Sequence, residues 1–229
     1  VITHKLNKSP NILALAGDLI NIETLFSAKE LVSNLGGRTE CRIADTCIPP
    51  NDRGLYAGTV PIEEINNSEI IFIIGSNPRI EAPVLNARIR NSWLRGTEVN
   101  LVGEKSDLTY DYNHMGTSLS ELDKIIKSKT RLFANKRILI ILGQGIFSRN
   151  DGYEALEVVK KFKESLNAEL ISLHVAASRV GAMDLNFVSD PGYSSSIEWS
   201  DIILNIGMDE YDLPEDKFVI YQGSHGDRG

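Results

Sequence analysis

Short apolar runs, each followed by glycine or a polar residue, set the pattern of this sequence. The runs are rich in Ile, Leu and Val, and most of them show no alternation between apolar and polar positions. Continuous runs of this length are typical of strands that are buried on both faces of a parallel sheet. The pattern predicts strands over residues 12–16, 70–74, 99–102, 138–142, 170–173, 202–206 and 218–221.

A different periodicity occupies the segments between several of these strands. Apolar residues recur three and four positions apart over 22–35, 82–94 and 153–166, which is the spacing of one face of a helix. Gly36 gives the first of these helices a stop signal, and Asp151 gives the last one an N-cap. Because strands alternate with helices, the sequence predicts an α/β fold built on mainly parallel sheets.

Two parts of the chain resemble each other weakly. Residues 12–17 are similar to residues 138–143, residues 68–75 are similar to residues 200–207, and each of these runs ends in glycine. Such self-similarity predicts two α/β units of Rossmann-like form. The boundary between them is expected in the charged stretch 124–136. The expected units are residues 1–130 and residues 131–229, the second one truncated at its C-terminus.

Composition narrows the classes of function. With 229 residues, 42% of them hydrophobic and 24% charged, the chain has the balance of a soluble globular protein. The formal net charge of −7 argues against a surface that neutralises phosphates, so we expect no nucleic-acid partner. The longest purely apolar runs fall far short of the roughly 20 residues of a membrane helix, so we expect no direct membrane insertion.

Residues that ligate metals are few and scattered in this sequence. Two cysteines, Cys41 and Cys47, are too few for a four-thiolate iron–sulfur cluster, and the four histidines lack ligand spacing. The sequence shows neither a nucleophile elbow nor a Walker loop for phosphate. We therefore expect two reduced thiols, no metal site and no catalytic residue.

The most specific local motif is the turn after the second predicted strand. Its candidate residues are Gly75, Ser76, Asn77 and Arg79. At the carboxyl end of a buried parallel strand, glycine allows a tight turn, and the free N–H groups of a following helix attract phosphate. The turn is therefore a candidate for binding a nucleotide or a pterin dinucleotide. In the alternative interpretation it only connects strand to helix, with Asn77 as the cap.

A second polar feature lies on the helical segment 82–94. Arg88 and Arg95 are seven residues apart and share a face of the helix, whereas Arg90 lies off that face. One explanation is an ordinary solvated surface. The other is a cationic face that docks an anionic neighbour of this acidic protein.

Four segments are distinctive when they are taken together. They are GSNPRIEAPVLNARIR at 75–90, DLTYDY at 107–112, AASRVG at 176–181 and YQGSHGDRG at 221–229. In combination they resemble the large iron–sulfur subunit of NADH:quinone oxidoreductase, respiratory complex I, within its molybdopterin-oxidoreductase-like region. Weaker likeness begins near Ile12, so the resemblance covers most of the chain. Together with the start at Val1, it implies an internal fragment of a longer subunit.

The resemblance implies iron–sulfur clusters in an N-terminal part that is absent here, and no cofactor in this chain. It implies partners among the other peripheral-arm subunits of complex I. The implied location is the cytoplasmic side of the bacterial inner membrane or the mitochondrial matrix side. In molybdenum relatives, a turn like that at Gly75 contacts the pterin dinucleotide, and a Cys or selenocysteine metal ligand lies upstream. Cys41 falls in that region, but its neighbours do not match the ligand motif, so the role is not carried over.

Three functions compete at this point. The main hypothesis is a non-catalytic scaffold region of the peripheral arm, itself inactive, which supports NADH-to-quinone electron transfer by the whole complex. The alternative is a fragment of a molybdopterin-dependent oxidoreductase, similar to formate dehydrogenase, that binds the pterin dinucleotide near Gly75. The third is an α/β module that binds some small molecule. The first two differ in whether the Gly75 turn faces a cofactor.

Overall fold

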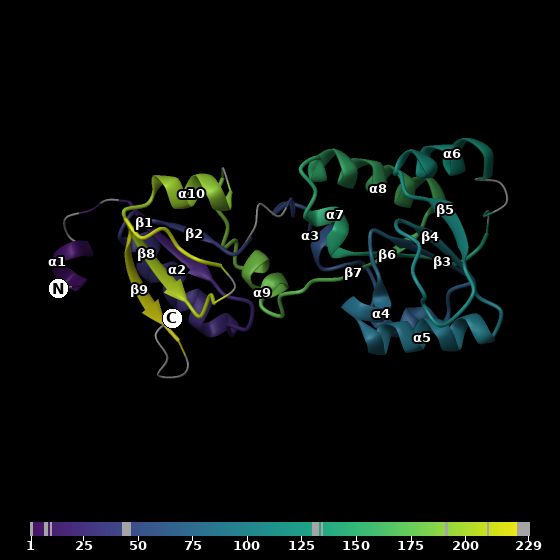
Figure 1. Cartoon of the computed structure of the whole chain (residues 1–229), viewed down its shortest axis with the longest axis horizontal. Helices are drawn as coiled ribbons and strands as arrows, with labels where there is room; N and C mark the ends of the chain where they lie inside the picture. Colours follow the sequence, from purple (N-terminus) through teal and green to yellow (C-terminus); the bar gives the residue numbers. More distant parts are fainter. Residues whose placement is uncertain are drawn as a thin grey trace. The chain divides into compact units, whose positions relative to one another are not determined.

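The computed structural model divides the chain into two compact α/β units (Figure 1). It describes residues 2–6, 9, 11–42, 47–129, 133, 135–190, 192–209 and 211–223. The first unit combines Val1–Thr46 with Val175–Gly229, and the second unit is Cys47–His174. Every strand pair in the described residues is parallel, so the predicted fold class is confirmed.

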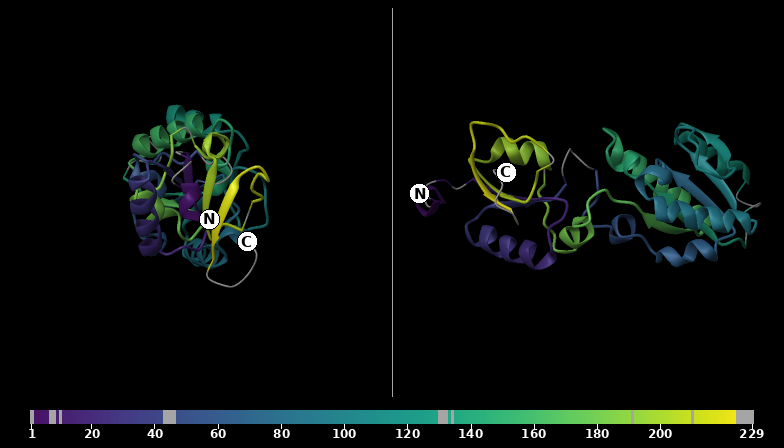
Figure 2. Two further views of the ribbon diagram at one scale, coloured as in Figure 1. Left: turned by 90° about the vertical axis from the view of Figure 1, so that its left-hand side faces the viewer. Right: turned by 60° about the horizontal axis from the view of Figure 1, so that its bottom comes forward.

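The first unit is built on a four-stranded sheet in the order β2-β1-β8-β9. Its strands are β1 (Ile12–Ala16), β2 (Arg38–Glu40), β8 (Ile202–Ile206) and β9 (Phe218–Gln222). Its helices are α1 (Ile2–Leu6), α2 (Ile22–Asn34), α9 (Arg179–Asp184) and α10 (Tyr193–Trp199). The two views show α2 on one face of the sheet and α10 on the other (Figures 1 and 2). Leu13, Leu15 and Ile203 belong to its buried core.

The second unit is built on a five-stranded sheet in the order β5-β4-β3-β6-β7. Its strands are β3 (Ile70–Ile74), β4 (Glu98–Val102), β5 (Asn113–Gly116), β6 (Ile138–Leu142) and β7 (Glu169–Ser172). Its helices are α3 (Arg53–Tyr56), η1 (Ile62–Asn66), α4 (Pro78–Glu81), α5 (Pro83–Leu94), α6 (Ser120–Lys129), α7 (Gln144–Phe147) and α8 (Gly152–Leu166). Helices α4 and α5 lie on one side of this sheet, and α6 and α8 lie on the other (Figure 1).

The chain does not divide at the predicted boundary between residues 130 and 131. Strands β3 and β6, which that boundary assigns to different units, pair in register from Ile70↔Ile138 to Ile74↔Leu142. Likewise β1 pairs with β8, from Ile12↔Ile202 to Ala16↔Ile206. A fully apolar strand needs neighbours on both sides, but its apolar pattern does not specify which similar strand it takes. Each unit therefore combines strands from both halves of the repeat.

The predicted repeat itself is present in the strand ends. Gly75 follows β3 and Gly207 follows β8, and both have a positive φ, of 61° and 57°. Beside each of them, the glycine after the neighbouring strand donates a 2.9 Å backbone hydrogen bond: Gly143 to Ile74, and Gly17 to Ile206. Gly75 and Gly207 thus lie at equivalent points of the two units, as the sequence predicts.

Candidate functional site

The Gly75 turn forms where β3 ends and the chain enters α4. Gly75 has φ 61°, its N–H donates to Val102 O at 3.1 Å, and its own oxygen accepts from Gly145 N at 3.0 Å. A Cβ atom here would stand 2.6 Å from Ile146 Cγ1. Glycine is therefore required both by the backbone conformation and by the close approach of α7.

A cavity of about 460 Å³ opens at this turn, in the size range of small-molecule sites. Three of the four sequence candidates, Gly75, Ser76 and Asn77, line it. The rest of its lining comes from α4, from α7 and the loop after it, from the end of β4 and the loop after it, and from the loop after β5: Glu81, Val102, Gly103, Glu104, Lys105, Ser106, Thr117, Leu119, Gly145, Ile146 and Arg149. This is where the sequence predicts a ligand, at the carboxyl ends of parallel strands.

Arg79, the fourth candidate, is not among the residues that line the cavity. Its guanidinium donates to the Asp107 carboxylate and, at 3.1 Å, to the Asp107 backbone oxygen. The pKa of Asp107 lies below its usual range, first because the Thr109 N–H donates to the carboxylate and second because of Arg79. Arg79 therefore links α4 to the loop that contains Asp107, and its guanidinium is not available as a ligand-binding group of the cavity.

The carboxylate of Glu81 lies on the backbone amides of the turn. Its Oε1 accepts from Asn77 N at 2.7 Å, and its Oε2 lies 3.5 Å from Gln144 N. These amides belong to the starts of α4 and α7, where free N–H groups favour an anion. The chain thus supplies its own anion at the position where sequence reasoning places a phosphate.

Asn77 occupies the N-cap position of α4, but its side chain makes no capping hydrogen bond. The prediction that the Asn77 side chain caps the helix is therefore wrong. The capping role passes to Glu81, which reaches back to the N-cap N–H in the manner of a capping box. Asn77 Oδ1 is instead buried and has no hydrogen-bond partner among the residues that the structure describes.

A pterin dinucleotide fits this turn only in part. Ser76, Asn77 and Ser106 line the cavity, and one buried oxygen of each (Ser76 Oγ, Asn77 Oδ1 and Ser106 Oγ) has no partner in the described part of the chain. Such atoms suit a polar ligand or water, because a buried polar atom without a partner is costly. A phosphate at the turn amides does not fit, since the Glu81 carboxylate occupies them and would repel it.

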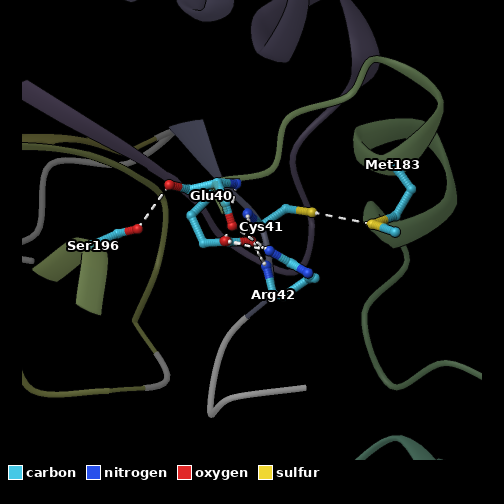
Figure 3. Close-up of polar contacts among 6 residues, drawn as sticks. Glu40, Cys41, Arg42, Met183 and Ser196 are labelled. Atoms are coloured by element: carbon cyan, nitrogen blue, oxygen red, sulfur yellow. Dashed lines mark hydrogen bonds and ion pairs between the residues drawn. The ribbon is translucent and has the colours of Figure 1, made fainter. Parts of the chain in front are cut away.

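The first unit holds a buried ionic cluster that sequence reasoning missed (Figure 3). Glu40 is fully buried, and its carboxylate accepts two hydrogen bonds from the Arg42 side chain, at 3.0 and 2.9 Å. It also accepts from the backbone N–H groups of Cys41, Arg42 and Ser189. No motif signalled this cluster, because Glu40 and Arg42 read as ordinary polar residues of a loop.

Cys41 lies beside this cluster with its sulfur directed at Met183, 3.8 Å from the Sδ atom (Figure 3). Burial raises the pKa of its thiol to about 12, although the nearby Arg179 acts in the opposite direction. A thiol held neutral is a poor nucleophile and a poor metal ligand. Cys41 and Cys47 are both buried, they are not joined by a disulfide, and they belong to different units.

Two general features of the described residues bear on function. Over the ranges given above, no three His, Cys, Asp or Glu side chains gather as a metal site would require. None of the helices described there combines the length and the apolar character needed to cross a bilayer.

Comparison with known proteins gives consistent similarities. The profile of the molybdopterin oxidoreductase family matches residues 1–229. The chain is 34% identical to the mitochondrial NADH-ubiquinone oxidoreductase 78 kDa subunit of Neurospora crassa, over 94% of this chain and 32% of that protein. It is 32% identical to the NADH-ubiquinone oxidoreductase 75 kDa subunit of Reclinomonas americana, over 98% of this chain and 37% of that one.

A bacterial relative gives the same result. The chain is 32% identical to a subunit of the NADH-quinone oxidoreductase of Rickettsia bellii, over 97% of this chain and 34% of that protein. The chain thus spans about a third of the length of the curated relatives that it matches.

Proposed function

Because this chain belongs to the molybdopterin oxidoreductase family and is similar over nearly its whole length to complex I subunits, we propose that it is a scaffold region of that complex. In this role it packs against other subunits of the peripheral arm and takes no part in the chemistry. NADH-to-quinone electron transfer runs through redox centres held elsewhere in the complex. The complex is bound to the bacterial inner membrane or the inner mitochondrial membrane, and this region lies on its cytoplasmic or matrix side.

The observation that supports this proposal most is the position of Glu81. Its carboxylate accepts the Asn77 N–H at 2.7 Å, at the turn where the molybdenum enzymes of this family are expected to bind the dinucleotide. A carboxylate within the chain neutralises these dipoles without any ligand. Gly75 also has a packing role against Ile146 that accounts for the glycine without a cofactor.

A second candidate function is favoured by a different observation. Three residues that line the cavity each have a buried oxygen without a partner among the described residues: Ser76 Oγ, Asn77 Oδ1 and Ser106 Oγ. This is the arrangement expected of a site that binds a polar ligand, and it suits the pterin-binding alternative. The two functions predict opposite consequences when these oxygens are removed.

The test replaces Asn77 by Ala in the natural polypeptide and measures NADH:quinone turnover per assembled complex. A scaffold should retain wild-type turnover, because in that role no step of electron transfer uses the Asn77 side chain. Ser128→Ala on α6 is the matched control, since Ser128 is an exposed polar residue outside the cavity. Molybdenum and oxidised pterin should be assayed in the same preparations.

Two results would replace the scaffold proposal by the pterin-binding one. The first is a large drop in turnover in Asn77→Ala with normal assembly and a normal Ser128→Ala control. The second is pterin that purifies in proportion to the wild-type polypeptide and is lost in Asn77→Ala.

A further inference from the structure

Helix α5 places polar side chains on its buried face. Asn86 is buried, donates to Leu108 O at 3.0 Å and accepts from the Tyr110 hydroxyl at 2.8 Å. Ser92 is fully buried and donates to Ile65 O at 3.0 Å. These bonds fix the helix against its own unit, so the orientation of its outer face is fixed as well.

The outer face of the same helix exposes several apolar side chains. Ile80 on α4 is 76% exposed, Val84 is 74% exposed and Leu94 is 59% exposed. Val84, Ala87 and Leu94 are three and then seven residues apart, so they share one face with the exposed Asn91, and Ile80 precedes them on α4. We call these four residues the α5 ridge. Single exposed apolar residues are ordinary, but several exposed on neighbouring elements mark an interaction surface.

Arginines accompany the α5 ridge, and they are not ion-paired within the described part of the unit. Residues 82–97 contain Arg88, Arg90 and Arg95 and no Asp or Glu, in a chain whose net charge is −7. Arg90 donates to Thr109 O at 3.2 Å, and Arg95 donates to Asn66 Oδ1 at 3.1 Å, both neutral acceptors. None of these three arginines forms an ion pair with any residue that the structure describes.

We propose that the α5 ridge docks a segment of a sibling subunit that carries apolar side chains flanked by Asp or Glu. The exposed apolar side chains of the ridge would be buried against the apolar side chains of that segment, and the three arginines would select acidic neighbours. This inference rests on the proposed function, because it takes the partner from the same complex. It adds the location of the contact and the chemistry of the partner.

The first experiment changes both the apolar residues and the arginines of this surface, in the natural polypeptide expressed in its own cells. Val84→Asp combined with Arg88→Glu should lower the amount of this polypeptide in the assembled complex about tenfold, as the loss of a central contact does. Lys127→Glu on α6 is the control, since it reverses an exposed charge on the other side of the sheet. The control should assemble like wild type.

Folding is separated from docking by two further measurements. The isolated chain with both substitutions should melt within about 2 °C of wild type, because both positions lie on the surface. A benzophenone amino acid at position 84 should crosslink, in the wild-type background, to a peptide of another subunit that contains Asp or Glu. If the double variant is itself unstable, this crosslink decides whether the α5 ridge docks such a segment.

The possible failures have different meanings. Normal assembly of the double variant, or crosslinks only to lipid, to this polypeptide or to a peptide without acidic residues, would overturn the docking surface alone. If the wild-type polypeptide does not purify with a complex of NADH:quinone activity, the proposed function fails, and the docking inference fails with it.

Discussion

Gly17 lies so close to Gly207 that a Cβ atom on Gly17 would stand 1.8 Å from the Gly207 carbonyl oxygen. The second unit repeats this contact, since a Cβ atom on Gly143 would stand 2.4 Å from the Gly75 carbonyl oxygen. In each unit the contact lies where two neighbouring central strands end. These glycines therefore serve the packing of the sheet ends, whatever else the Gly75 turn does.

Substituting Gly17 by Ala should destabilise the first unit. Because the added methyl group meets backbone on the neighbouring strand, we expect a loss of about 1–3 kcal/mol or more in the free energy of unfolding. Gly181→Ala in α9 is the matched control, since its new Cβ would have 3.5 Å to its nearest neighbour and Ala favours a helix. Urea unfolding of the purified chain measures both. Equal stability of the two variants would contradict this account of Gly17.

Substituting Glu40 by Gln should be among the most damaging changes to the first unit. It leaves the Arg42 guanidinium buried without a counter-charge, which typically costs about 3–5 kcal/mol. The double variant Glu40→Leu with Arg42→Met should lose less stability than Glu40→Leu alone and Arg42→Met alone lose in sum. In the double variant no charge is left unpaired. The double-variant cycle is measured by urea unfolding.

An exposed ion pair provides the control for that cycle. Glu69 pairs with Lys136 at 2.8 Å on the surface, where such pairs contribute little. Glu69→Gln should therefore shift the unfolding midpoint only slightly. A loss as large as that of Glu40→Gln would show that burial is not what makes the Glu40 pair important.

The buried thiol of Cys41 should make stability fall at alkaline pH. Its pKa rises from 9.0 to about 12 on folding, so the folded chain holds the proton more tightly than the unfolded chain does. The stabilisation of the folded chain that follows from this raised pKa is complete below pH 9. It is lost between pH 9 and pH 12, by up to about 1.4 kcal/mol per pH unit. The stability difference between wild type and Cys41→Ala should therefore shrink from about pH 8 to about pH 10.5. A difference that stays constant would show that Cys41 is accessible to solvent in the folded chain.

Removing the Glu81 carboxylate should weaken the Gly75 turn. Glu81→Ala takes away the acceptor of the Asn77 N–H, at a cost of about 1 kcal/mol, as for a lost cap. Added sulfate should restore part of this stability, because an anion can replace the carboxylate at the helix start. Glu104→Ala, which lines the same cavity, is the control for the general effect of sulfate. Equal responses of the two variants to sulfate would mean that the Glu81 contact has no special role.

The strand pattern could be predicted from sequence because it depends on local residues. The runs at 12–16, 70–74, 138–142 and 202–206 coincide with β1, β3, β6 and β8. Two edge strands, β2 and β5, were not predicted, because Arg38–Glu40 and Asn113–Gly116 are short and mainly polar. Each depends on pairing with an apolar neighbour, which no local pattern contains.

The pairing of the strands and the chemistry of the site depend on contacts between distant residues. The similar runs of the repeat do not specify whether β3 pairs with β8 or with β6. The carboxylates of Glu40 and Glu81 occupy ordinary polar positions in the sequence, and only the fold brings them onto backbone amides. The resemblance segment at 221–229 lies outside the described residues from 224 onward, so the structure does not test it.

Strand β1 can pair with β8 only after the ribosome has added the residues up to Ile206. The second unit, in contrast, is contained in residues 47–174, and its last strand ends at Ser172. During synthesis the second unit should therefore finish folding first, while the apolar strand Ile12–Ala16 has β2 on one side but lacks β8 on the other and attracts chaperones. A polypeptide truncated shortly before Ile202 should show a protease-resistant second unit and a first unit that is still open to cleavage.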